Sequence, residues 1–327
     1  MQAAWYEQYG PAKDVIQIGE LDTPEAGPGE VRVRLHASGV NPSDVKSRAG
    51  SRGPLKYPRI VPHSDGAGII DQVGAGIDPG RVGERVWVYN GQWERPLGTA
   101  AETIALPASQ VVRLPDRLSF AEGACLGIPA MTAHRCLFYA GPIEGQTVLV
   151  TGGAGAVGHC AVQLAKWAGA TVITTVSSPA KADHVRAAGA DHVINYRTED
   201  VAASIMDLTG GAGVDRIVDV DFGGNLAVTR AVLKNNGAVA VYASMGEREP
   251  VVPVYPFMFL NANIQMVFVY IMPDEAKQAA CRDILQAIEA EKLTSPIAAR
   301  FPLDRLAEAH ELVEQGRQIG NVVVDID

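Results

Sequence analysis

A glycine-rich segment contains the residues whose types and spacing point most clearly to chemistry. Gly153, Gly155 and Gly158 match the pattern G-x-G-x-x-G, directly after the apolar run 147–151. Bare backbone lets a pyrophosphate approach closely, and the amino end of a following helix receives its charge. Because the motif follows a strand and opens a helix, it indicates a dinucleotide-binding loop rather than a simple turn. The expected loop contacts are Gly152, Gly153, Gly155, Ala156, Val157 and Gly158.

The end of the next expected strand, 171–176, indicates which dinucleotide the loop would hold. A site that prefers NAD places an acidic residue about 20 residues after the glycines, where it binds the ribose 2′-hydroxyl. No acid lies between Val172 and Ala182, and Ser177, Ser178 and Lys181 occupy that place instead. Two hydroxyls and an ammonium can hydrogen-bond to a 2′-phosphate and neutralise it. The sequence therefore predicts NADPH, unless Lys181 is an ordinary solvated lysine.

The elements around the glycine loop alternate between strand and helix. Strands are expected at 147–151, 171–176, 192–194, 214–219 and 238–242, with a helix between each pair. This alternation predicts an α/β fold with a doubly wound parallel sheet.

The chain before residue 120 has a different sequence pattern, which is typical of β-strands. Val31–Ala37 alternates apolar and polar residues as a half-buried strand does, and Pro and Gly interrupt the sequence at short intervals. This pattern is typical of a small, twisted β domain. The last expected strand, Gly320–Ile326, would return to that domain because the parallel sheet is already complete.

The composition excludes several classes of protein. With 327 residues, 47% hydrophobic and 20% charged, the chain is long enough for about two globular domains. Its formal net charge of −9 disfavours nucleic-acid binding, which needs a basic face. Four scattered cysteines without a C-x-x-C pair exclude a zinc ribbon and suggest reduced thiols. Since the amino terminus also lacks a signal-peptide pattern, we expect a cytoplasmic protein.

One long uncharged stretch, Pro250–Pro273, resembles a membrane span only superficially. Its internal prolines and amide side chains are costly in hydrocarbon, so we expect a buried strand and pocket wall instead. Part of it, Val251–Tyr270, would pair sheet edges between two copies of the chain, because an exposed apolar edge strand is a liability. We therefore expect a homodimer.

Five motifs in order resemble the medium-chain dehydrogenase/reductase superfamily, in its zinc-free quinone oxidoreductase (zeta-crystallin-like) branch. They are Gly39–Asp44, Pro62–Gly68, Gly127–Ala133, the glycine loop and Asn195–Arg197. The resemblance covers essentially the whole chain. It implies a GroES-like β-rich domain of residues 1–122 and 272–327, a Rossmann domain of residues 123–271, and an active site in the cleft between them.

The resemblance also implies that no metal is bound. Zinc alcohol dehydrogenases of the superfamily carry their catalytic ligands where this chain has Asn41, His63 and Ile128, so one candidate ligand of three remains. A catalytic zinc site needs three protein ligands. The stretch 89–103, which matches the structural-zinc lobe, contains no cysteine.

Catalytic roles follow from the same resemblance. Asn41 would line the nicotinamide pocket and donate a hydrogen bond to the developing oxyanion. Tyr57, His63, Lys46 or a water molecule would supply the proton. The alternatives are that His63 is hydrogen-bonded within its own loop and that Tyr57 is an ordinary loop aromatic.

The resemblance assigns further residues to the cofactor. Thr132 matches a threonine near the nicotinamide ribose, and Lys181 and Tyr196 match residues that hold the 2′-phosphate and the adenosine end. Asp221 and Ser244 follow strand ends where the family wraps the cofactor.

The sequence thus predicts an NADPH-dependent oxidoreductase that transfers hydride to a quinone without a metal. One alternative is an NADPH-dependent reductase of activated C=C bonds, in a 2-alkenal or an enoyl thioester. A second alternative is a non-catalytic NADPH-binding protein with a structural or RNA-binding role. The sequence does not name the physiological electron acceptor.

Overall fold

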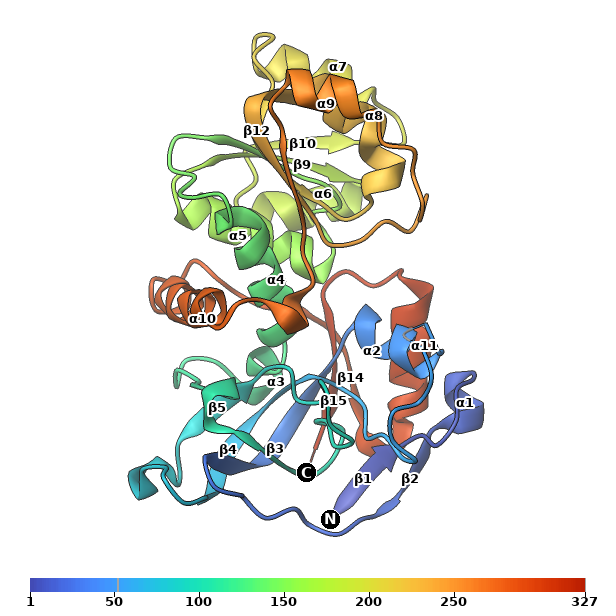
Figure 1. The fold of residues 1–327 in the computed structure, drawn as a ribbon, viewed down its shortest axis with the longest axis vertical. Helices are drawn as coiled ribbons and strands as arrows, with labels where there is room; N and C mark the ends of the chain where they lie inside the picture. Colours follow the sequence, from blue (N-terminus) through green and yellow to red (C-terminus); the bar gives the residue numbers. More distant parts are fainter. Residues whose placement is uncertain (52, 327) are drawn as a thin grey trace. The chain divides into compact units, whose positions relative to one another are not determined.

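The computed structural model describes residues 1–51 and 53–326. The chain forms two compact units, and both of its ends belong to the same one (Figure 1). Unit 1 combines residues 1–128 with the segment that begins at Ser295, and unit 2 is Pro129–Thr294. Unit 2 is built around a parallel sheet and unit 1 is β-rich, which confirms the predicted α/β fold class.

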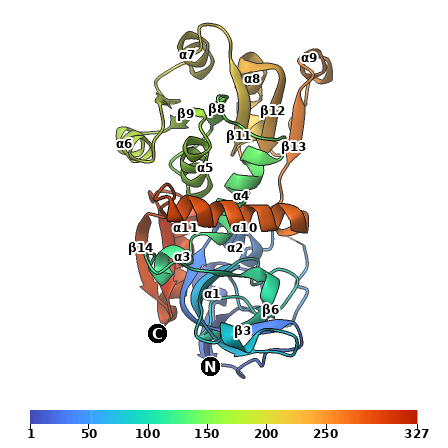
Figure 2. The same ribbon diagram turned by 90° about the vertical axis from the view of Figure 1, so that its left-hand side faces the viewer.

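Unit 2 contains a six-stranded sheet in the order β10-β9-β8-β11-β12-β13, in which every neighbouring pair is parallel. The chain begins in the middle at β8, winds outward to β10, and then returns to build the other half from β11. This order is that of a Rossmann sheet, and its switch point lies between β8 and β11. In Figure 2 the strands follow one another across the sheet to β13 at its edge.

The elements of unit 2 follow from short runs of β-branched residues that alternate with helical segments. Their bounds are α4 Gly127–Phe138, β8 Thr147–Val150, α5 Ala156–Trp167, β9 Thr171–Val176, α6 Pro179–Ala187, β10 His192–Asn195, α7 Val201–Leu208, β11 Val214–Asp219, α8 Phe222–Val232, β12 Leu233–Val241, α9 Val254–Phe259, β13 Asn263–Met266, the 3-10 turn η3 Val269–Ile271 and α10 Asp274–Glu289.

Unit 1 has a seven-stranded sheet centred on the long strand β3, and a separate hairpin of β1 and β2. The C-terminal strand β15 lies between β14 and β3 in the seven-stranded sheet. Side chains from both ends of the sequence, such as Ala3 and Val324, lie in one apolar core. The bounds are β1 Gln2–Trp5, α1 Ala12–Val15, β2 Gln17–Glu20, β3 Glu30–Val40, α2 Pro42–Arg48, β4 Asp65–Val73, η1 Pro79–Arg81, β5 Arg85–Val88, β6 Thr103–Pro107, η2 Ala108–Gln110, β7 Val111–Arg113, α3 Phe120–Gly123, β14 Ile297–Pro302, η4 Leu303–Arg305, α11 Leu306–Gln315 and β15 Asn321–Asp325.

The helix α10 belongs to a different unit from the one that the sequence predicts. The expected boundary between 271 and 272 assigns α10 to the β-rich domain, whereas the structure groups it with the parallel sheet. A hydrogen bond links α10 to α4 within this unit, where Nε2 of His134 lies 2.7 Å from Oδ2 of Asp283.

The uncharged stretch 250–273 is only partly the buried strand and pocket wall that we expected: Tyr270 and Met272 are buried and Asn263 lines a pocket, but the rest is largely a surface segment. Val254–Phe259 forms the helix α9, and β13 is an edge strand that pairs with β12. Val251 is 92% exposed and Phe259 is 77% exposed. Apolar composition alone does not distinguish a core strand from a surface segment. None of the helices in residues 1–51 and 53–326 has both the length and the apolarity that a membrane crossing requires.

Candidate functional site

All of the residues predicted to bind a cofactor except Thr132 lie at one edge of the parallel sheet. The glycine loop follows β8, Ser177 follows β9, Tyr196 follows β10, Asp221 follows β11 and Ser244 follows β12. Because these strands are parallel neighbours, their carboxyl ends meet at the same edge, where ligands bind in sheets of this kind.

The glycine loop is held in place by contacts that leave no room for side chains. Gly152 has a φ of +66°, and its N–H donates to Oγ1 of Thr175 over 3.0 Å. A Cβ on Gly153 would lie 2.0 Å from Oγ1 of Thr174, and a Cβ on Gly158 would lie 2.4 Å from the carbonyl oxygen of Gly152. These contacts explain why glycine occupies the first and third positions of the motif.

The amino end of α5 is open in the way that a bound phosphate requires. Its N-cap is Gly155, and no side chain caps the helix. A Cβ on Gly155 would meet its nearest atom, the Gly152 carbonyl oxygen, at 3.5 Å, so packing within the protein does not require this glycine. Uncapped amides and the helix dipole favour an anion at this end. The loop therefore fits a dinucleotide pyrophosphate.

The region after β9 is organised by the start of α6. Oγ of Ser178 accepts from the N–H of Lys181 at 3.4 Å, and Pro179 occupies the first turn. Ser178 is thus an N-cap, a structural role that leaves its hydroxyl hydrogen for another acceptor. Lys181 is half-buried, and Tyr196, after the neighbouring strand, is 51% exposed.

The loops after β11 and β12 are tied to each other. Oδ1 of Asp221 accepts from the N–H of Gly246 at 2.8 Å, and Oγ of Ser244 accepts from the N–H of Gly223 at 2.9 Å. The side chains of Asp221 and Ser244 therefore brace the loops in this structure.

Asp219, the last residue of β11, braces the same edge, a role that the sequence did not predict. Its buried Oδ1 lies 2.9 Å from Oγ1 of Thr151 and 2.7 Å from Nδ2 of Asn225. Burial raises the pKa of the Asp219 carboxyl. Its place at the last position of a strand, at the edge where the cofactor residues were expected, was the signal that could have identified it.

In unit 1, Asn41 lies in a buried cluster with Asp65, a residue for which the sequence predicted no role. Asn41 is 5% exposed, and its Nδ2 donates to Oδ2 of Asp65 over 2.8 Å. The N–H of Ile128 donates to both carboxyl oxygens of Asp65 at 2.9 Å. Burial, together with nearby Asp44, raises the pKa of Asp65 well above its usual range, while the two donors partly offset this shift.

The predicted proton donor His63 is a buried structural residue instead. It is 1% exposed, Nδ1 lies 2.8 Å from Oγ of Ser38, and Nε2 lies 2.9 Å from Nε2 of His310. Burial lowers the pKa of His63 to about 3, so the ring is neutral near pH 7. With both nitrogens engaged inside the protein, His63 is not placed to protonate a substrate. His310, on the apolar face of α11 beside Leu306 and Val313, was missed.

The two remaining predicted residues, Tyr57 and Thr132, are not part of these clusters. The hydroxyl of Tyr57 donates to the carbonyl oxygen of Glu94 over 2.7 Å, in a partly exposed loop. Thr132 is 5% exposed in α4.

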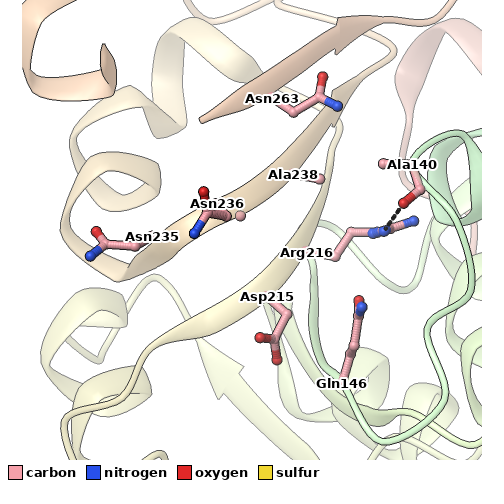
Figure 3. A pocket seen from close by; sticks show the side chains of 9 residues that line it. Ala140, Gln146, Asp215, Arg216, Asn235, Asn236, Ala238 and Asn263 are labelled. Carbon is pink, nitrogen blue, oxygen red and sulfur yellow. Dashed lines mark hydrogen bonds between the residues drawn. The ribbon is translucent and has the colours of Figure 1, made fainter. Parts of the chain in front are cut away.

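One pocket of unit 2 lies away from all of these residues (Figure 3). It has a volume of about 360 Å³ and is lined at the amino ends of β11, β12 and β13, opposite to the carboxyl edge that carries the predicted residues. Arg216 in its wall donates to the carbonyl oxygens of Leu137, in the last turn of α4, and of Ala140 and Gly141, which follow the helix. The guanidinium therefore completes the carboxyl end of that helix, which is a structural role.

Among residues 1–51 and 53–326, no group of three or more His, Cys, Asp or Glu side chains is arranged to hold a metal ion. At the ligand positions that the sequence resemblance identified, Asn41 and His63 are occupied by the internal bonds described above.

Two family models match the chain. Residues 27–116 match the alcohol dehydrogenase GroES-like domain, and residues 156–286 match the model described as zinc-binding dehydrogenase. The first match confirms that the β-rich unit is GroES-like.

Two curated relatives align over nearly their whole length. A 2-haloacrylate reductase from Burkholderia sp is 31% identical, over 99% of this chain and 98% of that protein. The quinone oxidoreductase of Homo sapiens is 30% identical, over 97% of this chain and 94% of that protein.

Solved structures share the complete fold. A mycobacterial quinone oxidoreductase superposes with a TM-score of 0.88 at 28% identity, and it covers 100% of both chains. The Escherichia coli quinone oxidoreductase complexed with NADPH superposes with a TM-score of 0.86 at 25% identity, again over 100% of both chains.

Proposed function

We propose that this chain, which belongs to the medium-chain dehydrogenase/reductase superfamily and to its quinone oxidoreductase-like members, reduces quinones with NADPH and without a metal ion. The observation that carries the proposal is the carboxyl edge of the parallel sheet. There an open glycine loop precedes α5, and two serines and a lysine occupy the place of the acid that an NAD site uses.

The bound cofactor would supply a hydride from its nicotinamide ring. The protein would supply binding and orientation. The amino end of α5 would hold the pyrophosphate, and Lys181, with Ser177 and Ser178, would neutralise the 2′-phosphate. Asn41 would donate its second Nδ2 hydrogen to the oxyanion that develops on the acceptor. A water molecule, or Tyr57 after its hydroxyl leaves the Glu94 carbonyl oxygen, would then provide the proton.

The experiment is to follow NADPH oxidation at 340 nm with 1,4-benzoquinone, 9,10-phenanthrenequinone and a short 2-alkenal in parallel, with NADH and EDTA as controls. We expect turnover with the quinones that prefers NADPH and survives EDTA. Loss of turnover on adding EDTA would reject the metal-free reaction. Binding of NADPH without turnover of any acceptor would instead favour a binding or structural protein.

A second candidate function is the reduction of an activated C=C bond. The observation that favours it is the 31% identical 2-haloacrylate reductase, a relative whose name describes an acrylate substrate. Turnover of the 2-alkenal or of 2-chloroacrylate, with neither quinone reduced, would select this function.

A further inference from the structure

We propose that Asp65 is a positioning residue, which fixes the carboxamide of Asn41 in the one orientation that presents a donor to the substrate. The proposal rests on the function given above, because it assumes that Asn41 contacts the acceptor. It adds a residue for which neither the sequence resemblance nor the comparisons supply a role.

The first step is the direction of the bond between the two side chains. A carboxamide has a donor end and an acceptor end of nearly the same shape, so either end can face a neighbour. Both oxygens of Asp65 accept from the N–H of Ile128, which favours the ionised form against the effect of burial, and a carboxylate only accepts. Because Oδ2 of Asp65 lies 2.8 Å from the carboxamide, the donor end of Asn41 must face it. One Nδ2 hydrogen is thereby used, and the directions of the other hydrogen and of Oδ1 are fixed.

The second step is that Asp65 itself has no freedom to turn. It is fully buried, and the N–H of Ile128 donates to both of its carboxyl oxygens. Gly127 makes this contact possible, because a Cβ there would lie 2.1 Å from Oδ1 of Asp65. The main chain of Asn41 is held from the other side, where its N–H donates to Oδ2 of Asp44 over 2.8 Å.

The third step is a buried chain of hydrogen bonds that holds the backbone of Asp65. Oγ1 of Thr99 lies 2.6 Å from the Asp65 carbonyl oxygen, which can only accept, so the threonine hydrogen is used there. Oγ of Ser38, 2.8 Å away, must then donate to Thr99. It follows that Nδ1 of His63 donates to Ser38 and that Nε2 of His63 accepts from Nε2 of His310.

This ordering runs in one direction from His310 to Asp65, and it requires His63 to be neutral and His310 to carry a hydrogen on Nε2. Burial lowers the pKa of His310 well below its usual range, so its ring is neutral as well. His63 also has a φ of +76°, a conformation that costs a non-glycine residue energy and persists only where the surroundings impose it. The histidine pair thus serves as a support for Asp65, which explains why a buried histidine stands where a proton donor was expected.

The test uses a double-mutant cycle of the full-length protein with Asn41→Ala, Asp65→Asn and both together. An amide at position 65 has one acceptor and one donor in place of the two acceptor oxygens that face Asn41 and Ile128. Either end of the Asn41 carboxamide can then find a partner, so its orientation is no longer fixed. We expect Asp65→Asn to lower kcat for the quinone about tenfold to a hundredfold, with the dissociation constant of NADPH unchanged. In the Asn41→Ala background the same substitution should change kcat less than twofold. Additive effects would overturn the proposal.

A second measurement does not depend on any substrate. The Nδ2 hydrogens of Asn41, assigned by NMR from the signal lost in Asn41→Ala, should include one that exchanges slowly with solvent. Slow exchange should be lost in Asp65→Asn. It should be reduced in Thr99→Val, which removes the donor to the Asp65 carbonyl oxygen and serves as the second variant if Asp65→Asn does not fold. Asp71→Asn, on the same strand but paired with Arg32, is the control and should change neither readout.

The two measurements separate the two possible failures. A slowly exchanging Asn41 hydrogen without quinone turnover would reject the proposed function and keep the structural link. Rapid exchange of both hydrogens in the wild-type protein would reject the positioning role, whatever the enzyme reduces.

Discussion

At the scale of single residues, Lys181 would carry the preference for NADPH in the proposed function. It stands at the start of α6, next to the N-cap Ser178, and no carboxylate lies between Val172 and Ala182. We expect Lys181→Ala to raise the KM for NADPH roughly tenfold to a hundredfold, since a hydrogen bond to a charged group contributes about 1.5–3 kcal/mol. The KM for NADH should not change. Lys166→Ala, which removes an ion pair with Asp191, is the matched control and should leave the ratio of the two KM values intact.

His159 gives a second prediction at this scale, on stability against pH. Its ring is 6% exposed, both nitrogens are buried without a hydrogen-bond partner in the described chain, and it stacks on His184 at 4.3 Å. Burial and the neighbouring imidazole lower the pKa of His159 to about 4. Below pH 6.5 the unfolded chain binds a proton here that the folded chain does not, so stability is lost as the pH falls.

The measurement is urea unfolding of the wild type and of His159→Leu from pH 7.5 to 4. The wild type should lose about 1.4 kcal/mol per pH unit relative to the variant between about pH 6.5 and 4. Taking the difference between the two proteins removes the contributions of Asp65 and Asp219, whose raised pKa values act in the opposite direction. Parallel curves would show that the ring is not buried as a neutral group.

At the scale of elements, the turn from β8 into α5 contains two glycines with different roles: packing requires Gly158, whereas cofactor binding would require Gly155. Gly158→Ala forces a Cβ to 2.4 Å from the Gly152 carbonyl oxygen, so we expect a loss of about 1–3 kcal/mol of stability. Gly155→Ala has room at 3.5 Å and should leave the unfolding transition unchanged while it weakens NADPH binding. Thermal unfolding and cofactor titration of both variants check the contrast, which an equal loss of stability in the two would contradict.

The sequence predicted the local elements well and the contacts between distant elements poorly. The alternation of β-branched runs with helices predicted β8 to β12 and the glycine loop, because both patterns are local. The link between His63 and His310 spans 247 positions in sequence, and no periodicity encodes such a pair. The role of Asp65 escaped for the same reason, since its partners come from α2 and α4. The helix α9 was missed because an apolar run has the same composition on a surface as in a core.

At the scale of the whole molecule, the exposed apolar side chains around β13 support the proposed homodimer. Met266 is 60% exposed on this edge strand, and Tyr255 and Phe259 on α9 are 67% and 77% exposed. An unpaired apolar edge is prone to pair with another strand, and two copies of the chain would satisfy it.

Light scattering checks this expectation. The wild type should have twice the chain mass of 34.6 kDa, and Met266→Lys should have the mass of one chain. Val82→Lys, at a 51% exposed apolar position of unit 1, is the control and should keep the larger mass. A wild-type protein with the mass of one chain would reject the dimer.

Because unit 2 is inserted within the sequence of unit 1, the two units can complete their folding only in a certain order during synthesis on the ribosome. The chain enters unit 2 at Pro129 and leaves it at Thr294, so the parallel sheet can close while the ribosome is still translating. The strand β3, made much earlier, must wait for β15 to cover one of its sides, and His63 must wait for His310. The half of the protein that is translated first is therefore finished last. In a nascent chain halted before residue 295, the parallel sheet would be closed and the apolar core of unit 1 would be open, which is the kind of surface that chaperones bind.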